Sequence, residues 1–355
     1  MGVWRFYGGR SFTHDGRFVE NPEWILSVLS DCDRVVHLRP QDIILPGFAD
    51  FHVHLASPAN SLGVLPRQLL ATGVLVAGDA GTEGWRTVSR AATSEGLRIK
   101  RWLSLLPDGL SRYPMVTRFS GLTDDDWIHW QSLMKERRTE ILGVKIRLGQ
   151  IDEADDVQLL TQGLDLARTL NLPLMVHVTG AWINPVTVLN ALRPGDVVTH
   201  VYHGRRGTLA DGPNVMEALT AAIHKGVWLD LGHGANHFSW RSFRRLTAHQ
   251  VLPDTISTDM TQRTWGKAPV YDMAHLCSKL WAGGLSWTAI YRAVLTSPLK
   301  YLGLSLPADS AVVLRYRSEP VEYPDTEGEV VVATGGWRPQ YIIAHGHVVM
   351  AREGL

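Results

Sequence analysis

Two histidines, His52 and His54, end a stretch in which an apolar run and a Pro-Gly pair lead into Phe-Ala-Asp-Phe-His-Val-His. Because side chains alternate along a strand, Asp50, His52 and His54 would share one face. Neutral imidazoles are common zinc ligands, and two of them about 7 Å apart on one strand can bind the same divalent ion. His-x-His also occurs by chance, so the pair predicts a metal site only if the chain supplies further ligands.

Four further polar residues stand at or near the ends of apolar, strand-like segments: Lys145, His177, His200 and Asp259. Parallel barrels gather their catalytic groups at the carboxyl ends of the strands. A single histidine on a strand is more often structural than functional. Six positions that obey one geometric rule, however, predict a shared site.

Lys145 is the unusual member of this set, because a buried lysine is costly unless it is paired. One interpretation is an ion pair with a nearby carboxylate. The other is a neutral amine that reacts with carbon dioxide to give a carbamate, an anion that could bridge two metal ions as a carboxylate does.

The elements that would position these residues alternate between apolar strands and longer amphipathic segments such as 155–170 and 212–225, as in βα units around a parallel sheet. Besides the strand that ends at His54, strands are expected at 73–79, 97–103, 142–147, 174–178, 196–202, 227–231 and 255–259. Eight such units predict an α/β fold, a (β/α)8 TIM-type barrel. A doubly wound sheet is the structural alternative.

Unlike the barrel segment, both ends of the chain are patterned as short β strands and turns. Strands are expected at 3–7, 34–38, 311–316, 329–333 and 341–344. We expect the two ends to pair into one small flanking β-sheet domain. The predicted division is residues 1–42 and 303–355 for the two parts of this domain, and 43–302 for the metal-dependent barrel.

Composition excludes several classes of partner. The chain of 355 residues has 35 Lys+Arg and 35 Asp+Glu, so the basic excess typical of nucleic-acid or anionic-membrane binding is missing. Cys32 and Cys277 lie far apart, as expected of free thiols in a reducing compartment. With no signal-peptide pattern and no apolar run of membrane-spanning length, we predict a cytoplasmic protein that acts on a small molecule. A homo-oligomer is compatible with these features.

The ordered motifs resemble the amidohydrolase superfamily, in its binuclear branch with a carboxylated lysine, which includes dihydroorotases and hydantoinases. The resemblance covers about 43–302 and rests on Pro-Gly-Phe-Ala-Asp-Phe-His-Val-His at 46–54, Gly-Val-Lys-Ile-Arg at 143–147, Val-His-Val at 176–178, Thr-His-Val-Tyr-His-Gly at 199–204, Gly-His-Gly at 232–234 and Ser-Thr-Asp at 257–259. Within this branch the chain most resembles a dihydroorotase-like deacetylase subgroup, which includes enzymes that hydrolyse acetylated hydroxy acids.

This resemblance implies two divalent metal ions, most simply zinc. It places His52, His54 and Asp259 on the more buried ion, His177 and His200 on the second, and N-carboxylated Lys145 between them. A metal-bridging hydroxide would attack a carbonyl, and Asp259 would pass its proton to the leaving group. The strand-4 lysine separates this branch from deaminase-type relatives, so hydrolysis ranks above deamination.

Residues outside the ligand set are weaker candidates. Arg147 shares the strand face of Lys145 and could pair with a substrate carboxylate, or else with a barrel carboxylate. His203 and His233 follow strands 6 and 7 and are predicted catalytic donors to the carbonyl, although a structural role is equally compatible. Trp182 is a predicted substrate contact in the loop after strand 5. The loops after His54 and His177 depart from the subgroup, which leaves the substrate open.

The sequence therefore predicts a metal-dependent hydrolase that cleaves an amide or ester, N-acyl or O-acyl, bond of a small molecule, as a deacetylase does. A cyclic amidohydrolase that opens a hydantoin, lactam or dihydroorotate-like ring is the alternative within the class. The alternative outside the class is a catalytically inactive barrel that serves as a binding subunit, and the filled ligand positions count against it.

Overall fold

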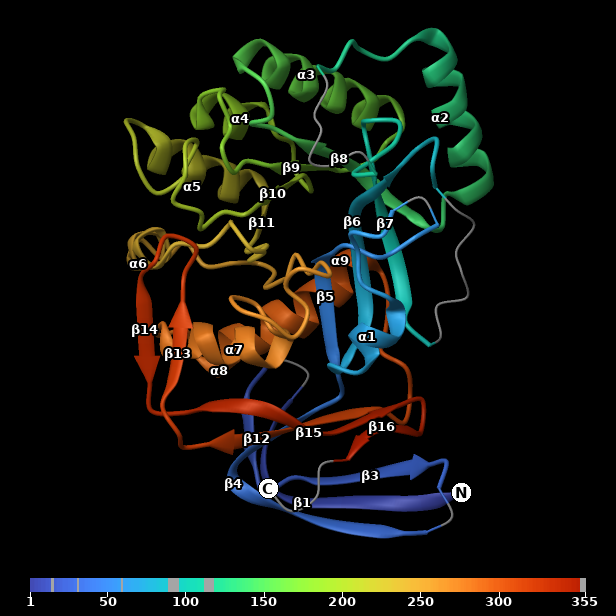
Figure 1. Ribbon diagram of the computed structural model, residues 1–355, viewed down its shortest axis with the longest axis vertical. Coiled ribbons are helices and arrows are strands. Elements are labelled where there is room, and N and C mark those ends of the chain that lie inside the picture. Colours follow the sequence, from blue (N-terminus) through green and yellow to red (C-terminus); the bar gives the residue numbers. More distant parts are fainter. Residues whose placement is uncertain (14–15, 31, 59, 89–95, 112–117, 352–355) are drawn as a thin grey trace.

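The computed structural model describes the chain except residues 14–15, 31, 59, 89–95, 112–117 and 352–355 (Figure 1). Seven parallel strands form one sheet in the order of the chain, and this sheet is a nearly closed barrel. The strands are β5 (Phe48–Val53), β6 (Val74–Gly84), β7 (Arg98–Ser104), β8 (Ile141–Arg147), β9 (Leu174–His177), β10 (Val197–Thr199) and β11 (Trp228–Asp230). This sheet confirms the predicted barrel. The prediction succeeded because buried apolar strands that alternate with helices are typical of a parallel sheet.

The eighth predicted strand, 255–259, is an extended segment that completes the ring through isolated bridges. The amide of Leu231 donates to the carbonyl of Thr255 at 2.9 Å, and the amide of Asp259 donates to the carbonyl of His52 at 2.7 Å. The segment thus joins β11 on one side and β5 on the other. Its closure of the barrel brings Asp259 beside His52.

Helices cover the outside of the barrel, and those between β7 and β11 lie over its upper part in Figure 1. They are α1 (Pro66–Leu70), α2 (Asp124–Arg137), α3 (Glu153–Thr169), α4 (Pro185–Ala191), α5 (Val215–Lys225), α6 (Trp240–Ala248), α7 (Met273–Ala282), α8 (Trp287–Tyr291) and α9 (Ser297–Leu302), with a π-helical turn at Arg292–Thr296 before α9.

Helix α3 illustrates why the sequence folds locally in this way. Asp152 caps its N-terminus by accepting from the amide of Asp155 at 2.9 Å. Its buried stripe includes Leu160 and Leu164 at helical spacing. Gly163 lies so close to Ile146 of β8 that an added Cβ would be 2.9 Å from that side chain. The helix is therefore packed tightly against the strand that carries Lys145.

A second sheet is built from both ends of the chain, as predicted, and lies at the foot of Figure 1. Its strands are β1 (Gly2–Phe12), β2 (Phe18–Glu20), β3 (Glu23–Val28), β4 (Arg34–Leu45), β12 (Ala311–Arg317), β15 (Gly336–Ala344) and β16 (His347–Ala351). The two ends meet where β4 pairs antiparallel with β12, with Ile44 opposite Val313. The boundaries at 42 and 303 stay a prediction, because β4 runs unbroken across residue 42.

The segment expected at 329–333 does not join this sheet. Instead β13 (Val321–Pro324) and β14 (Val330–Ala333) form a separate hairpin beside α6 (Figure 1). The turn of the hairpin is hydrogen-bonded to the end of the loop between β11 and α6. Asp325 accepts from the amide of Trp240 at 3.0 Å, and Ser239 donates to Glu327 at 2.7 Å. These bonds explain the departure, and they fix a loop that reaches the barrel mouth.

Asp50 is a fully buried carboxylate at the point where the barrel closes. It accepts from the amide of Thr258 at 3.0 Å and from the hydroxyl of Thr258 at 2.5 Å. Burial raises the pKa of Asp50 to about 7, against an ordinary value of 3.8. The folded protein therefore keeps this proton at pH values where the unfolded chain has lost it.

As the pH rises from about 4 to about 7, the unfolding free energy of the metal-free protein is accordingly expected to fall by a few kcal/mol on account of Asp50. An Asp50→Asn variant does not titrate there, so the stability advantage of the wild type over the variant should shrink as the pH rises through this window. Urea unfolding of both proteins at several pH values measures the difference. A difference that stays constant from pH 4 to pH 7 would contradict the raised pKa.

Within the described part of the chain, no helix is both long and apolar enough to cross a membrane.

Candidate metal centre

A cavity of about 360 Å³ opens at the barrel end where the predicted ligands lie. Part of its wall is apolar and includes Leu62, Leu105, Leu106, Leu110 and Leu159. Its polar lining includes His52, His54, Lys145, Arg147, His177, His200, His237 and Asp259. The structure thus brings all six predicted metal ligands to one cavity, as the carboxyl ends of barrel strands require.

His52, His54 and Asp259 form the first donor group, in which one ligand atom from each residue lies within 4.8 Å of the others. Oδ1 of Asp259 is 3.4 Å from Nε2 of His52 and 3.0 Å from Nε2 of His54. All three side chains are buried. Both imidazoles therefore present the same nitrogen to one carboxylate oxygen.

The other nitrogen of each of these histidines is held by a threonine backed by an aspartate. Nδ1 of His54 contacts the hydroxyl of Thr82 at 2.8 Å, and that hydroxyl donates to Asp79 at 2.5 Å. In the same way Nδ1 of His52 is 2.9 Å from the hydroxyl of Thr199, which donates to Asp230, and 3.1 Å from Asp230 itself.

These outer partners place the proton on Nδ1 and leave the Nε2 lone pairs facing Asp259. When both imidazoles are neutral, acceptors face each other at 3.0–3.4 Å, and a proton or a metal ion must lie between them. Burial lowers the pKa of His52, but the contacts with Asp230 and Asp259 outweigh it and raise that pKa. A divalent ion with bonds of about 2.0–2.2 Å to nitrogen and oxygen fits such a spacing. The donor set therefore suits a metal ion.

The hydroxyl of Thr82 is expected to matter for metal affinity although it does not face the ion. In a Thr82→Val variant, Nδ1 of His54 loses its link to Asp79, and affinity should fall by about 10–100-fold. Competition with a chromophoric chelator measures this change. Thr72→Val is the matched control, because Thr72 is also buried but, among the described residues, its hydroxyl bonds only to the carbonyl of Leu69. Equal affinities in the two variants would contradict the role of Thr82.

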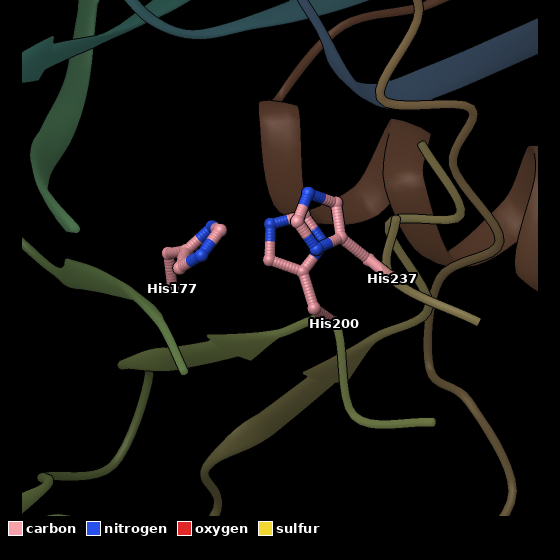
Figure 2. A group of neighbouring side chains, drawn as sticks. All are labelled: His177, His200 and His237. Carbon is pink, nitrogen blue, oxygen red and sulfur yellow. The ribbon is translucent and has the colours of Figure 1, made fainter. Parts of the chain in front are cut away.

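His177, His200 and His237 form the second donor group, with one ligand atom of each again within 4.8 Å of the others. Figure 2 shows the three rings turned toward one another at the ends of β9 and β10 and from the loop after β11. Nε2 of His177 is 3.2 Å from the carbonyl of Thr179, and Nδ1 of His200 is 2.6 Å from the carbonyl of Gly232. Donation to these carbonyls leaves Nδ1 of His177 and Nε2 of His200 available as ligand atoms.

The two groups adjoin at Asp259. Its Oδ1 contacts the first group, and its Oδ2 lies 3.6 Å from Nε2 of His237 in the second. The rings of His52 and His200, one from each group, are 5.1 Å apart between centroids. Two ions held by these groups would therefore be neighbours, as in a two-metal site.

Burial and neighbouring side chains together set the protonation of His177, His200, His237 and Asp259. Burial lowers the pKa of His177 and of His200 well below the ordinary value, and nearby positively charged side chains lower them further. The pKa of His237 falls to about 3 for the same main reason. Burial alone would raise the pKa of Asp259, but the contacts with His52 and His54 hold it well below its usual range. Neutral imidazoles and an ionised carboxylate are the forms that bind metals.

Lys145 lines the same cavity as a buried amine with a poor partner. Its Nζ donates to Sδ of Met175 at 3.1 Å, and a thioether is a weak acceptor. Burial lowers the pKa of Lys145 to about 7, and the attraction of Asp259 and Asp230 does not offset this effect. A large part of the amine is therefore neutral near pH 7.

The other predicted site residues take different places. Arg147, the predicted substrate contact, lines the cavity. Trp182 is not among the described residues of the lining; it is 45% exposed, with the guanidinium of Arg206 stacked on its ring at 3.2 Å. Neither His203 nor His233 belongs to the described lining, although both are fully buried. The catalytic roles of His203 and His233 and the substrate contact of Trp182 stay predictions that the geometry does not favour.

His233 instead supports the loop that carries His237. Its Nε2 is 2.7 Å from Nζ of Lys279, which also contacts the carbonyl of Pro324 and lies 4.5 Å from the ring of Phe238. The hydrogen bonds tie α7 and the β13–β14 hairpin to the barrel mouth. A buried lysine with these partners helps to hold the loop in one position.

His237 is the member of the second donor group that the sequence analysis missed. It stands in a loop rather than at a strand end, three residues before the α6 helix begins at Trp240. The available signal was the cluster of polar and glycine residues at 232–237 directly after strand 7, where barrels place active-site loops.

Curated relatives of the chain are bacterial deacetylases. Deacetylase Atu3266 of Agrobacterium fabrum is 27% identical over 325 residues, which are 87% of this chain and 79% of that protein. A deacetylase of Brucella anthropi is 26% identical over 324 residues, 87% and 80% of the two chains. No family model matches the chain.

Solved structures share the whole fold. A dihydroorotase superposes with a TM-score of 0.84 at 24% identity, and an adenine deaminase with a TM-score of 0.77 at 20% identity, each over 98% of both chains. At these identities the likeness concerns the barrel with its flanking sheet rather than the reaction.

Proposed function

We propose that this chain, a member of the amidohydrolase superfamily with deacetylases among its homologues, is a metal-dependent hydrolase that cleaves the amide or ester bond of a small acylated molecule. The observation that carries the proposal is the pair of adjoining donor groups that meet at Asp259 on the cavity. Buried polar groups of this kind contribute little to the free energy of folding, whereas two adjoining donor groups can bind two divalent ions.

His52, His54 and Asp259 would hold one ion, and His177 and His200 would hold the second. Imidazole and carboxylate ligands suit zinc, and we infer zinc at both positions. Divalent ions bound there would supply Lewis acidity, which lowers the pKa of a water molecule and polarises a carbonyl.

Lys145 would complete the site as a carbamate. Its neutral amine would add to carbon dioxide, so that a nitrogen–carbon bond forms, one C=O π bond opens, one N–H proton passes to the solvent, and the amine becomes an anionic carbamate. Burial and the pKa of about 7 support this reaction, because only the neutral amine is nucleophilic. The carbamate would lie between the two donor groups.

Asp259 would carry the proton. It is ionised, and its Oδ2 is the oxygen that lies away from His52 and His54. In the proposed reaction it accepts a proton from the attacking water and delivers it to the leaving nitrogen or oxygen. Arg147 would pair with an acidic group on the substrate, and the leucines of the cavity wall would contact its apolar part.

The test is hydrolysis by protein loaded with zinc in bicarbonate buffer, beside the same protein after chelation. The substrates are an N-acetyl amino acid series, an O-acetyl hydroxy acid series, and a hydantoin with a dihydropyrimidine. We expect release of acetate that is lost on chelation and restored by zinc. Ring opening without acyl release would replace the proposal with the cyclic amidohydrolase. No turnover of any substrate by protein that holds two ions would favour the inactive barrel.

A further inference from the structure

We propose that His237 is a direct ligand of the second metal position, which is then held by three imidazoles and fills without the Lys145 carbamate. The proposal rests on the metal-dependent function above and goes beyond it. There, the second ion has two histidines and a modified lysine. Here, the chain itself supplies a complete set of protein ligands.

The ring geometry supports this role. The centroid of the His237 ring is 4.1 Å from that of His200 and 5.0 Å from that of His177, and the latter two are 4.3 Å apart. Three imidazoles this close form the kind of three-histidine set that binds zinc and leaves a fourth position open for water or substrate. Their ligand atoms, within 4.8 Å of one another, need only a small inward movement to reach one ion.

The hydrogen bonding of His237 also indicates a missing partner. Its Nδ1 is buried with no hydrogen-bond partner in the described structure, and its Nε2 stops 3.6 Å from Oδ2 of Asp259. Buried imidazole nitrogens are normally satisfied, as Nε2 of His177 and Nδ1 of His200 are by backbone carbonyls. A metal ion is a partner that this nitrogen-rich surrounding would accept.

The loop that carries His237 is fixed in place. The amides of His233 and Gly234 donate to the carbonyls of Ser257 and Thr258 at 3.1 and 3.0 Å, and the loop is tied to the hairpin turn where Thr326 donates to the carbonyl of Phe238. A ligand on a held loop is pre-organised, which favours metal binding over a mobile contact.

The two candidate ligands of the second position can be separated by cobalt titration of chelator-stripped protein in buffer purged of carbon dioxide. Cobalt(II) is used in place of zinc because its visible spectrum reports the coordination geometry of the bound ion. A competing chelator gives the affinity of each protein for cobalt. The proteins are the wild type, Lys145→Ala, His237→Asn and His275→Asn. His275 is the matched control, since it is also a buried histidine with an unpartnered nitrogen but is not among the described residues of the cavity lining.

We expect the wild type, Lys145→Ala and His275→Asn each to bind two ions. His237→Asn should bind the second ion at least about 100-fold more weakly, beyond the effect of losing an outer partner. Wild-type affinity for both ions in His237→Asn would overturn the proposal, and so would loss of the second ion in Lys145→Ala alone. Two ions bound in this pattern by a protein that hydrolyses none of the substrates would leave the His237 assignment standing and refute the proposed function.

Discussion

Replacement of Asp259 by asparagine is expected to lower kcat/KM for acyl hydrolysis by about 10³-fold, within the range of about 10²–10⁴ for loss of a positioned proton carrier. Asparagine keeps the shape of the side chain but cannot take the proton of the attacking water. The change also removes the negative charge of Asp259, whose Oδ1 lies 3.4 Å from Nε2 of His52 and 3.0 Å from Nε2 of His54. The measurement is steady-state hydrolysis by the variant and the wild type, each assayed together with its metal content.

Asp254→Asn is the control for this change. Asp254 lies at the start of the same closing segment, where it accepts from the amide of Leu229 at 2.9 Å, and it is not among the described residues of the cavity lining. Its activity should stay within about 3-fold of wild type, because removal of charge there does not touch the metal ligands. If the Asp259 variant keeps a full metal load and more than a tenth of the wild-type rate, proton transfer must be assigned to another group.

The six predicted ligands could be found in the sequence because the barrel imposes a simple rule on them. Each stands at the carboxyl end of an apolar segment, and parallel strands in a closed barrel bring those ends to one mouth. Lys145 fits this rule as well as the histidines do, and the structure places it beside Met175 within the same cavity. The strand ends were therefore enough to predict that these six residues share a cavity, whereas their assignment as metal ligands came from the family resemblance and stays a prediction.

Loop residues obey no such rule, which is why His237 was not predicted, while His203 and His233 were predicted as catalytic donors. All three follow strands 6 or 7, and their sequence neighbours do not reveal which way a loop turns. The structure turns His233 back toward Lys279 and His237 toward His200. The decisive contacts come from the hairpin at 321–333, more than 80 residues along the chain.

The eighth strand shows a second limit of pattern reading. Ile256 is the apolar centre of a segment whose polar side chains serve the outer shell of the site. Thr255 and Ser257 both donate to Asp230, each at 2.7 Å, and Asp230 in turn holds His52. Backbone hydrogen bonds to β11 and β5, together with these side-chain bonds to a neighbouring strand, hold the segment, so it was predicted in the right place but forms isolated bridges instead of a long ladder.

Gly234 is the point at which the backbone and the site are most closely joined. Its φ of +49° lies in the left-handed region, which glycine adopts without strain. An added Cβ would lie 2.2 Å from Oδ2 of Asp259 and 2.7 Å from Cδ2 of His237. Any side chain there must displace a ligand from each of the two donor groups.

Gly234→Ala is therefore expected to lower both metal affinity and hydrolysis by at least about 100-fold, a loss on the order of 3 kcal/mol, and to destabilise the fold by about 1–2 kcal/mol through the left-handed backbone. Chelator competition, substrate turnover and urea unfolding measure the three effects. Gly303→Ala is the matched control: its φ is +62°, but nothing lies within 4 Å of an added Cβ, so it should show the loss of stability alone. Equal metal affinity in the two variants would mean that Asp259 and His237 move aside for the methyl group, and that their close packing on Gly234 does not set the geometry of the metal centre.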